Sequence, residues 1–233
     1  QIEAIKKKGT RLLQPLIDLN RGLESAARPL LQMAKLLGVS RKVAREAFEQ
    51  ALEKQRECQE HMLEIGRKAL KALEQDPQKF AVDIFARPYN GFVEEAHKCI
   101  PNKFASRGML VLPVDFLDIA AEPAKRHMYW GMGQLILKAS RMVKHHPQLF
   151  GTDITNFSCG PDSCVIGYFR DIMDRKPSLT LELDSHTADA GLETRVEAFL
   201  DIVTAYRQLL VDQQIMPRQS EFNAARAMLT RDQ

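Results

Sequence analysis

The first 76 residues carry apolar positions at helical spacing and none of the alternation that is typical of strands. The clearest stripe begins after Ser40, whose hydroxyl is suited to cap a helix, and it continues to about Glu74, where an Asp-Pro pair interrupts it. Charged residues fill the opposite face. We therefore predict an all-helical segment over residues 1–76, with a long helix over 40–74 that lies on a body or on a partner.

From residue 77 onward, short apolar runs alternate with helical patterns four times. The predicted strands cover 80–86, 109–115, 152–157 and 178–184, and the predicted helices cover 91–108, 127–146, 162–175 and 191–213. Four successive β-α units predict a parallel sheet with helices on both faces. The expected fold class is α/β, with a four-stranded, Rossmann-like sheet over residues 77–233 after the helical segment.

Composition narrows the function classes only modestly. The 233 residues are 45% hydrophobic, and the net charge of +3 arises from 33 basic and 30 acidic residues. This balance gives no reason to expect a nucleic-acid partner. There is no run of about 18 apolar residues, and no signal-type apolar stretch follows the basic start, so we expect no membrane span, no secretory leader and a cytoplasmic setting.

Polar residues gather after the predicted strands, where doubly wound sheets bind their ligands. We expect a pocket lined by these residues, because the carboxyl ends of parallel strands share one edge of the sheet. The candidates are Arg87, Tyr89, Asn156, Ser158, Cys159, Asp162, Asp184, His186, Asp189 and Arg195.

The stretch "NFSCGPDSC" over residues 156–164 holds two of the four cysteines. It contains a single glycine and lacks both the Gly-Lys-Ser/Thr end of a P-loop and the three-glycine dinucleotide fingerprint, so we see no nucleotide motif. Cys159 and Cys164 have no second cysteine pair and no close histidine couple, which disfavours zinc. A phosphate site and a zinc site are therefore both weak readings of this loop.

The cysteines differ in their surroundings. Cys159 has polar, turn-forming neighbours and precedes a predicted helix, which suits either a nucleophilic thiol paired with His186 or a ligand to iron. Spacing does not separate these two readings. Cys164 precedes "VIGYF" and is predicted to face the core, whereas Cys58 is structural or incidental.

Four stretches of the chain resemble the CoA-substrate-specific enzyme activase-related proteins, which are allied to the 2-hydroxyacyl-CoA dehydratases and their ATP-dependent activators. They are "ARPYNGFVEEAHKCIPNKFASRGMLVLPVDFL", "YWGMGQLILKAS", "ITNFSCGPDSC" and "KPSLTLELDSHTADAGLETRVEAFLDI", within about residues 80–205. The resemblance implies a C-terminal-type, dehydratase-like domain associated with an iron–sulfur cluster and with low-potential electron transfer or CoA-ester radical chemistry. It marks Cys159 as the best candidate cluster ligand and Cys99 as the next.

The sequence departs from that family pattern in two ways, which concern the ATPase part and the number of cluster ligands. The Asp-x-Gly-Ser/Thr signatures of the activator are missing from this sequence, so the ATPase part would lie outside the chain. Dehydratases use more cysteines per cluster than Cys159 and Cys99 supply, so a cluster would be shared or absent from this segment. The expected partners are other domains of the same longer protein, a dehydratase or activator partner, or further copies of the chain.

Two other functions stay open from the sequence. The chain could be a non-catalytic docking or scaffold domain whose long helix packs on a partner. It could also be a thiol enzyme that uses Cys159.

Overall fold

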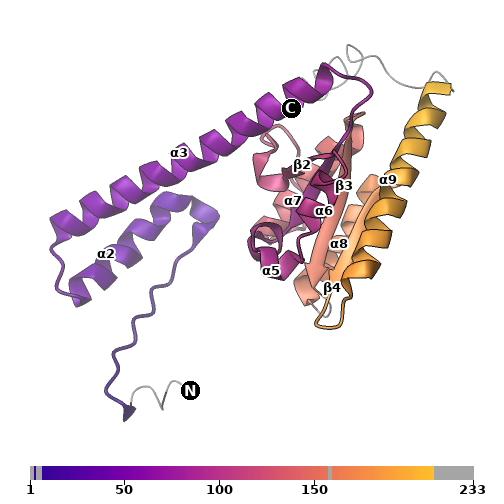
Figure 1. The fold of residues 1–233 in the computed structure, drawn as a ribbon. Coiled ribbons are helices and arrows are strands. Elements are labelled where there is room, and N and C mark those ends of the chain that lie inside the picture. The colour runs from indigo at the N-terminus through magenta and orange to yellow at the C-terminus, as the bar shows by residue number, and fades with distance from the viewer. Residues whose placement is uncertain (1–2, 4–6, 157–158, 213–233) are drawn as a thin grey trace. The chain divides into compact units, whose positions relative to one another are not determined.

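A computed structural model describes residue 3 and residues 7–156 and 159–212. In chain order, the elements are η1 (Leu19–Arg21), η2 (Leu23–Ala26), α2 (Ala27–Leu36), α3 (Arg41–Glu74), β1 (Ala81–Ala86), α4 (Pro88–Phe92), α5 (Glu94–His97), α6 (Ile100–Ala105), β2 (Leu110–Pro113), η3 (Val114–Phe116), α7 (Gly131–His145), β3 (Leu149–Asn156), α8 (Gly160–Met173), β4 (Ser178–Leu183) and α9 (Asp189–Asp212). Figure 1 shows their arrangement.

The chain divides into two compact units, Gln1–His61 and Met62–Gln233. The division falls inside α3 and so precedes the boundary predicted after residue 76. The physical reason lies in the last turns of α3. Leu73 belongs to the core of the second unit, and Gly66 is buried so closely against the Phe116 carbonyl that an added Cβ would lie 1.8 Å from its oxygen.

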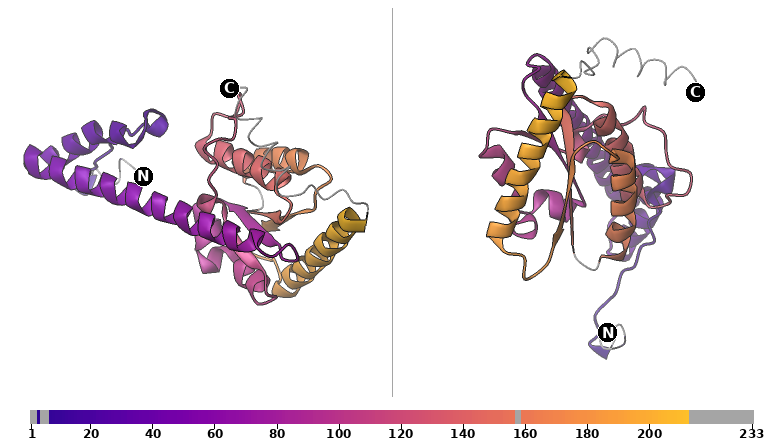
Figure 2. Two further views of the ribbon diagram at one scale, coloured as in Figure 1. Left: turned by 90° about the horizontal axis from the view of Figure 1, so that it is seen from above. Right: turned by 90° about the vertical axis from the view of Figure 1, so that its right-hand side faces the viewer.

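The first unit is a helical hairpin made by α2 and the first half of α3, which lie side by side (Figures 1 and 2). Gly38 turns the chain between them with a φ of +80°, a conformation that glycine adopts without strain. The Ser40 hydroxyl accepts a hydrogen bond of 3.3 Å from the backbone N–H of Val43, as expected of a helix cap. The predicted helical segment and its long capped helix are therefore confirmed.

The second unit is built on a four-stranded parallel sheet with the strand order β2-β1-β3-β4. Asp83 on β1 is in register with Leu112 on β2 and with Gly151 on β3. The predicted α/β fold with four parallel strands is confirmed. The central strands β1 and β3 are almost wholly buried, because helices cover both faces.

Helices form a layer on each face of this sheet (Figure 2). On one face, α7, α8 and the end of α3 pack over a core that includes Leu73, Phe85, Leu112, Val143, Leu149 and Phe169. On the other face, α6 and α9 pack over a core that includes Val82, Ile84, Phe104, Phe150, Leu181 and Phe199. These two apolar layers hold the strand ends, and hence the site described below, in place.

The helix predicted over 91–108 is divided into the three short helices α4, α5 and α6. Val93 has an extended backbone between α4 and α5. Lys98 and Cys99 then adopt left-handed conformations, with φ of 49° and 56°, just before Pro101. These non-helical backbone conformations break the helix where the sequence pattern suggested only an irregularity.

The prediction that Cys164 faces the core is wrong. Cys164 is exposed on α8. The residues that α8 buries are Asp162, Val165, Ile166, Phe169 and Met173. This spacing defines a stripe that leaves position 164 on the solvent side, so the apolar run after Cys164 does not include it.

Of the helices that the structure describes, none combines the length and apolar character needed to cross a membrane.

Candidate functional site

The candidate site lies beyond the carboxyl ends of β1 and β3. From β1 the chain crosses to β2 on one side of the sheet, whereas β3 and β4 extend the sheet on the other side. This reversal creates a topological switch point between β1 and β3, which is where open α/β sheets bind ligands. The described residues that follow these two strands, 87–90 and 159–162, therefore form the walls of the site together with Asn156.

Arg87 is the central side chain of the site. It follows β1 and forms a two-point ion pair with Asp162 in the first turn of α8, with Nε–Oδ1 at 3.0 Å and Nη2–Oδ2 at 3.2 Å. Thr155 on β3 donates a hydrogen bond of 2.9 Å to the same Oδ2. Burial alone would lower the pKa of Arg87, but the Asp162 carboxylate outweighs it and raises that pKa, so the guanidinium stays charged.

Cys159 lies against this guanidinium. The residue is partly exposed and immediately precedes α8, and its Sγ contacts Nη2 of Arg87. Its backbone is also anchored: the Cys159 N–H donates to the Asn156 carbonyl at 3.1 Å, and the Ser163 hydroxyl donates to the Cys159 carbonyl at 2.8 Å. The cation is thus placed to balance negative charge on a sulfur atom that solvent or a partner can reach.

Two aromatic rings flank the guanidinium. Its central carbon lies 5.0 Å from the centre of the Tyr89 ring and 5.8 Å from the centre of the Trp130 ring, both within cation–π range. The Asn156 amide donates a hydrogen bond of 3.3 Å to the Tyr89 hydroxyl, which joins the segments after β1 and β3. Tyr89 and Trp130 therefore add cation–π contacts to the ion pair that Arg87 makes with Asp162.

Beneath Arg87 lies a cavity of about 10 Å³, next to Asp153 and Asp162. Such a volume holds about one water molecule, so this cavity is not a binding site for an acyl-CoA. Asp153, on β3, is only 4% exposed. Burial raises the pKa of its carboxyl to about 7, and the negative charge of Asp162 adds to that rise. A carboxyl group that titrates near neutrality therefore lies directly under the site.

Four of the predicted pocket residues lie instead at the end of β4 and the start of α9. Asp184 accepts hydrogen bonds from the His186 backbone N–H at 2.9 Å and from the Thr187 hydroxyl at 2.7 Å. The Thr187 hydrogen bond is the main reason that the pKa of Asp184 is lowered. This arrangement is a side-chain-stabilised turn before α9, with His186 exposed at its tip.

The other two residues of this group bind neighbouring elements. Asp189 pairs with the buried Lys103 of α6 at 2.6 Å, and Lys103 also pairs with Glu193 at 2.8 Å. Arg195 donates a hydrogen bond of 2.6 Å to the Thr180 carbonyl of β4. These contacts tie α6, β4 and α9 together, and none of them involves a side chain that surrounds Arg87.

The single predicted pocket is therefore resolved into two groups. Arg87, Tyr89, Asn156, Cys159 and Asp162 come together at the switch point. Asp184, His186, Asp189 and Arg195 form the turn and ion pairs around α9. Ser158 lies outside the described residues.

Sequence reasoning did not select three residues that the structure places at the site. Trp130 and Thr155 contact Arg87 or its partner, and Asp153 lines the cavity below. Trp130 lies in an irregular segment, although it is the sole tryptophan of the chain. Asp153 stands inside an apolar strand, and a lone aspartate in a buried strand is the signal by which it could have been found.

Cys99 has a different environment from Cys159. It caps the start of α6, and its Sγ donates a hydrogen bond of 3.2 Å to a Glu94 carboxylate oxygen. That hydrogen bond is the main reason that the pKa of the Cys99 thiol is raised. Cys99 is therefore held as a thiol beside a carboxylate, whereas Cys159 lies beside a cation.

The described residues do not by themselves assemble an iron–sulfur site. Clusters are commonly held by three or four cysteine thiolates. Within residues 7–156 and 159–212, no three histidine, cysteine, aspartate or glutamate side chains come together in a way that would hold a metal ion.

Comparison with known families gives one match. The family model that matches is described as the CoA enzyme activase uncharacterised domain (DUF2229), and it covers residues 1–117, from the helical segment through β2 and η3. Neither a curated protein nor a solved structure matches the chain. Because the match covers half of the sequence, the chain belongs to the CoA enzyme activase uncharacterised domain family.

Proposed function

We propose that this chain is an iron–sulfur-associated domain of a CoA enzyme activase protein, in which Cys159 supplies one ligand to a cluster completed from outside the described residues. Its role would be low-potential electron transfer or CoA-ester radical chemistry in a 2-hydroxyacyl-CoA dehydratase-type system. The ATPase of that system would reside in another part. The observation that carries the proposal is the contact between Cys159 and Arg87 at the switch point of the sheet.

That contact supports a ligand role for three physical reasons. The sulfur is partly exposed, so a cluster held mainly by another domain can approach it. The guanidinium beside it can donate to a coordinated sulfur, and hydrogen bonds of this kind tune the reduction potential of clusters. Asp162 and Thr155 fix the guanidinium, so the donor keeps its position before and after electron transfer.

Cys99 ranks behind Cys159 as a ligand. A thiol must lose its proton to bind iron, and the Glu94 carboxylate opposes that loss by accepting a hydrogen bond from the Cys99 Sγ. We propose Cys99 as a second ligand only on the condition that iron replaces the Glu94 carboxylate as the partner of the Cys99 sulfur.

The test uses the full-length protein, purified without oxygen and reconstituted with iron and sulfide. Iron and sulfide content and the visible absorbance are compared for wild type, Cys159→Ala, Cys99→Ala and Cys164→Ala. Cys164 is the matched control, because it is an exposed cysteine on the same helix. We expect Cys159→Ala to lose iron and Cys164→Ala to retain it; equal iron content in both would overturn the proposal.

The thiol-enzyme alternative receives less support. His186 is exposed in the turn before α9, whereas the contact of the Cys159 side chain is with Arg87. A general base must lie within hydrogen-bond reach of the thiol that it activates. Rapid, His186-dependent alkylation of Cys159 would favour this alternative over the cluster proposal.

A further inference from the structure

The helical hairpin of the first unit contains an open groove between α2 and α3, with a volume of about 1070 Å³. Its floor is formed by apolar side chains from both helices and from the turn between them. These are Ala27, Leu31, Val39, Phe48 and Leu52. All residues of the groove belong to one compact unit, so its shape does not depend on the rest of the chain.

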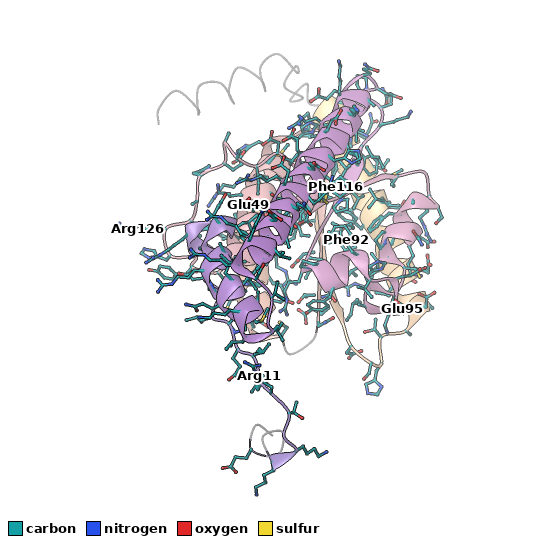
Figure 3. The ribbon with its side chains drawn as sticks, turned by 90° about the vertical axis from the view of Figure 1, so that its left-hand side faces the viewer. Arg11, Glu49, Phe92, Glu95, Phe116 and Arg126 are labelled. Carbon is teal, nitrogen blue, oxygen red and sulfur yellow. The ribbon has the colours of Figure 1, made fainter. Side chains whose placement is uncertain are left out.

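The apolar floor is poorly covered by the unit itself. Among the residues of 7–61 whose burial the structure describes, only Ala26 is buried, and Leu31, Phe48 and Leu52 are half-buried. Leu37 and Val43, which do not line the groove, are 59% and 55% exposed. The apolar floor itself is only half-covered, and exposed apolar surface of this kind marks an interaction site in a folded protein. Figure 3 views the hairpin from the side, with Glu49 labelled on α3.

The rim of the groove carries a surplus of positive charge. Its two acidic residues are already compensated, since Glu24 pairs with Arg56 and Glu49 pairs with Arg45 at 3.0 Å. Arg28, Lys35 and Arg41 also line the groove and make no ion pair with any described residue. An occupant that fits this rim carries negative charge on both sides of an apolar strip.

We propose that the groove binds an amphipathic α-helix of a partner protein whose apolar face is flanked by aspartate and glutamate. A third helix laid into the groove between two packed helices buries the floor by ridge-into-groove packing. Recognition of an amphipathic helix by an apolar groove is an established binding mode, in which anchors spaced by three and four residues fill the floor. Acidic residues beside those anchors would meet Arg28, Lys35 and Arg41 and would set the choice of partner.

This proposal is independent of the iron–sulfur proposal. The groove contains no cysteine, and each of its residues lies before His61, whereas Cys159 and Arg87 belong to the second unit. Loss of helix binding would leave iron content unchanged, and loss of iron would leave helix binding unchanged.

The experiment measures the fluorescence anisotropy of labelled synthetic helices in the presence of the full-length protein. The probes are an amphipathic leucine–glutamate helix, a leucine–lysine helix with the same apolar face, and a scrambled leucine–glutamate peptide. The test variant carries Arg28→Glu, Lys35→Glu and Arg41→Glu. The matched control carries Lys71→Glu, Arg126→Glu and Arg175→Glu, which change three exposed cations outside the groove.

We expect wild type and control to bind the leucine–glutamate helix, more weakly at high salt, and to ignore the scrambled peptide. The groove variant should lose affinity by on the order of tenfold or more and should gain affinity for the leucine–lysine helix. An unfolded variant would bind neither helix, so a gain in affinity for the leucine–lysine helix shows that the groove variant is still folded. Four outcomes would each overturn the proposal. Two concern the helices: equal binding of both helices, or unchanged binding by the groove variant. The other two concern a different occupant: binding only to phosphatidylserine vesicles, or filling of the groove by a second copy of the chain.

Discussion

At the scale of single residues, Arg87 determines the geometry of the candidate site. Its guanidinium contacts a carboxylate, a sulfur atom and two aromatic rings that come from three segments of the chain, namely the start of α8, α4 and the residue before α7. Asp162, its acidic partner, is only 7% exposed. The Arg87–Asp162 ion pair therefore both positions the cation beside Cys159 and contributes to the stability of the fold.

Replacement of Arg87 by methionine should lower the free energy of unfolding by about 3 kcal/mol, because it leaves the buried Asp162 carboxylate without its cation. Denaturant unfolding measures this change. The double variant Arg87→Met with Asp162→Asn should recover part of the loss, since it also removes the unpaired charge of Asp162. Arg175→Met is the surface control, with an expected change within about 0.5 kcal/mol. A cost for Arg87→Met no larger than this control would show that the pair does not hold the site together.

Asp153 should make stability depend on pH. Its folded-state pKa of about 7 lies above its ordinary value of 3.8, so the folded chain holds the proton more tightly than the unfolded chain. Stability is therefore lost as pH rises from about 4 to about 7, by at most about 4 kcal/mol, and stays constant above that range. Asp153→Asn removes this loss, so the variant should gain stability over wild type as pH rises through that window. Unfolding curves at several pH values measure this change, and Asp171→Asn on the exposed side of α8 is the control. A stability difference between Asp153→Asn and wild type that does not change with pH would contradict the prediction.

At the scale of elements, the hydrophobic pattern was sufficient to predict all four strands and the long capped helix. Strands such as β1 are short apolar runs bounded by polar residues, and the stripe of α3 is long enough to define its period. The pattern failed where local backbone conformation decides the outcome, as at Lys98 and Cys99 between α5 and α6. It also failed on α8, where an apolar run after Cys164 did not reveal which side of the helix that cysteine occupies.

The packing of α3 on the sheet unit gives a prediction at this scale. Gly66→Ala places a Cβ 1.8 Å from the Phe116 carbonyl oxygen, and backbone must move to relieve that contact. We expect a loss of about 2 kcal/mol or more in the free energy of unfolding, despite the higher helix propensity of alanine. Figure 3 labels Phe116 on this side of the molecule.

The control for this change is Gly167→Ala, within α8. Nothing lies within 4 Å of a Cβ at Gly167, which is exposed, so alanine should stabilise the protein by about 0.5 to 1 kcal/mol. Thermal unfolding distinguishes the two variants by the sign of their change. Similar effects at both positions would mean that the close approach of α3 to Phe116 is not present in solution.

At the scale of the whole molecule, strand order explains how far the site could be predicted. The sequence places polar residues after every strand, but it does not specify which strands are neighbours. The order β2-β1-β3-β4 puts Arg87 and Cys159 at adjacent strand ends, whereas β4 lies two strands from β1, about 10 Å away. Asp184, His186, Asp189 and Arg195 therefore form a separate group, and contacts such as that of Trp130 with Arg87 depend on three-dimensional proximity alone.

The ligand role that we propose for Cys159 is tested most directly by the electron paramagnetic resonance spectrum of the reduced full-length protein. If Cys159 binds the cluster as proposed, Cys159→Ser replaces a coordinating sulfur atom by oxygen, whereas Cys164→Ser changes only an exposed side chain on α8. The account predicts that Cys159→Ser shifts the g-values or abolishes the signal, and that Cys164→Ser leaves the wild-type spectrum. A spectrum that is unchanged by Cys159→Ser, or a wild-type protein that holds no iron, would contradict it.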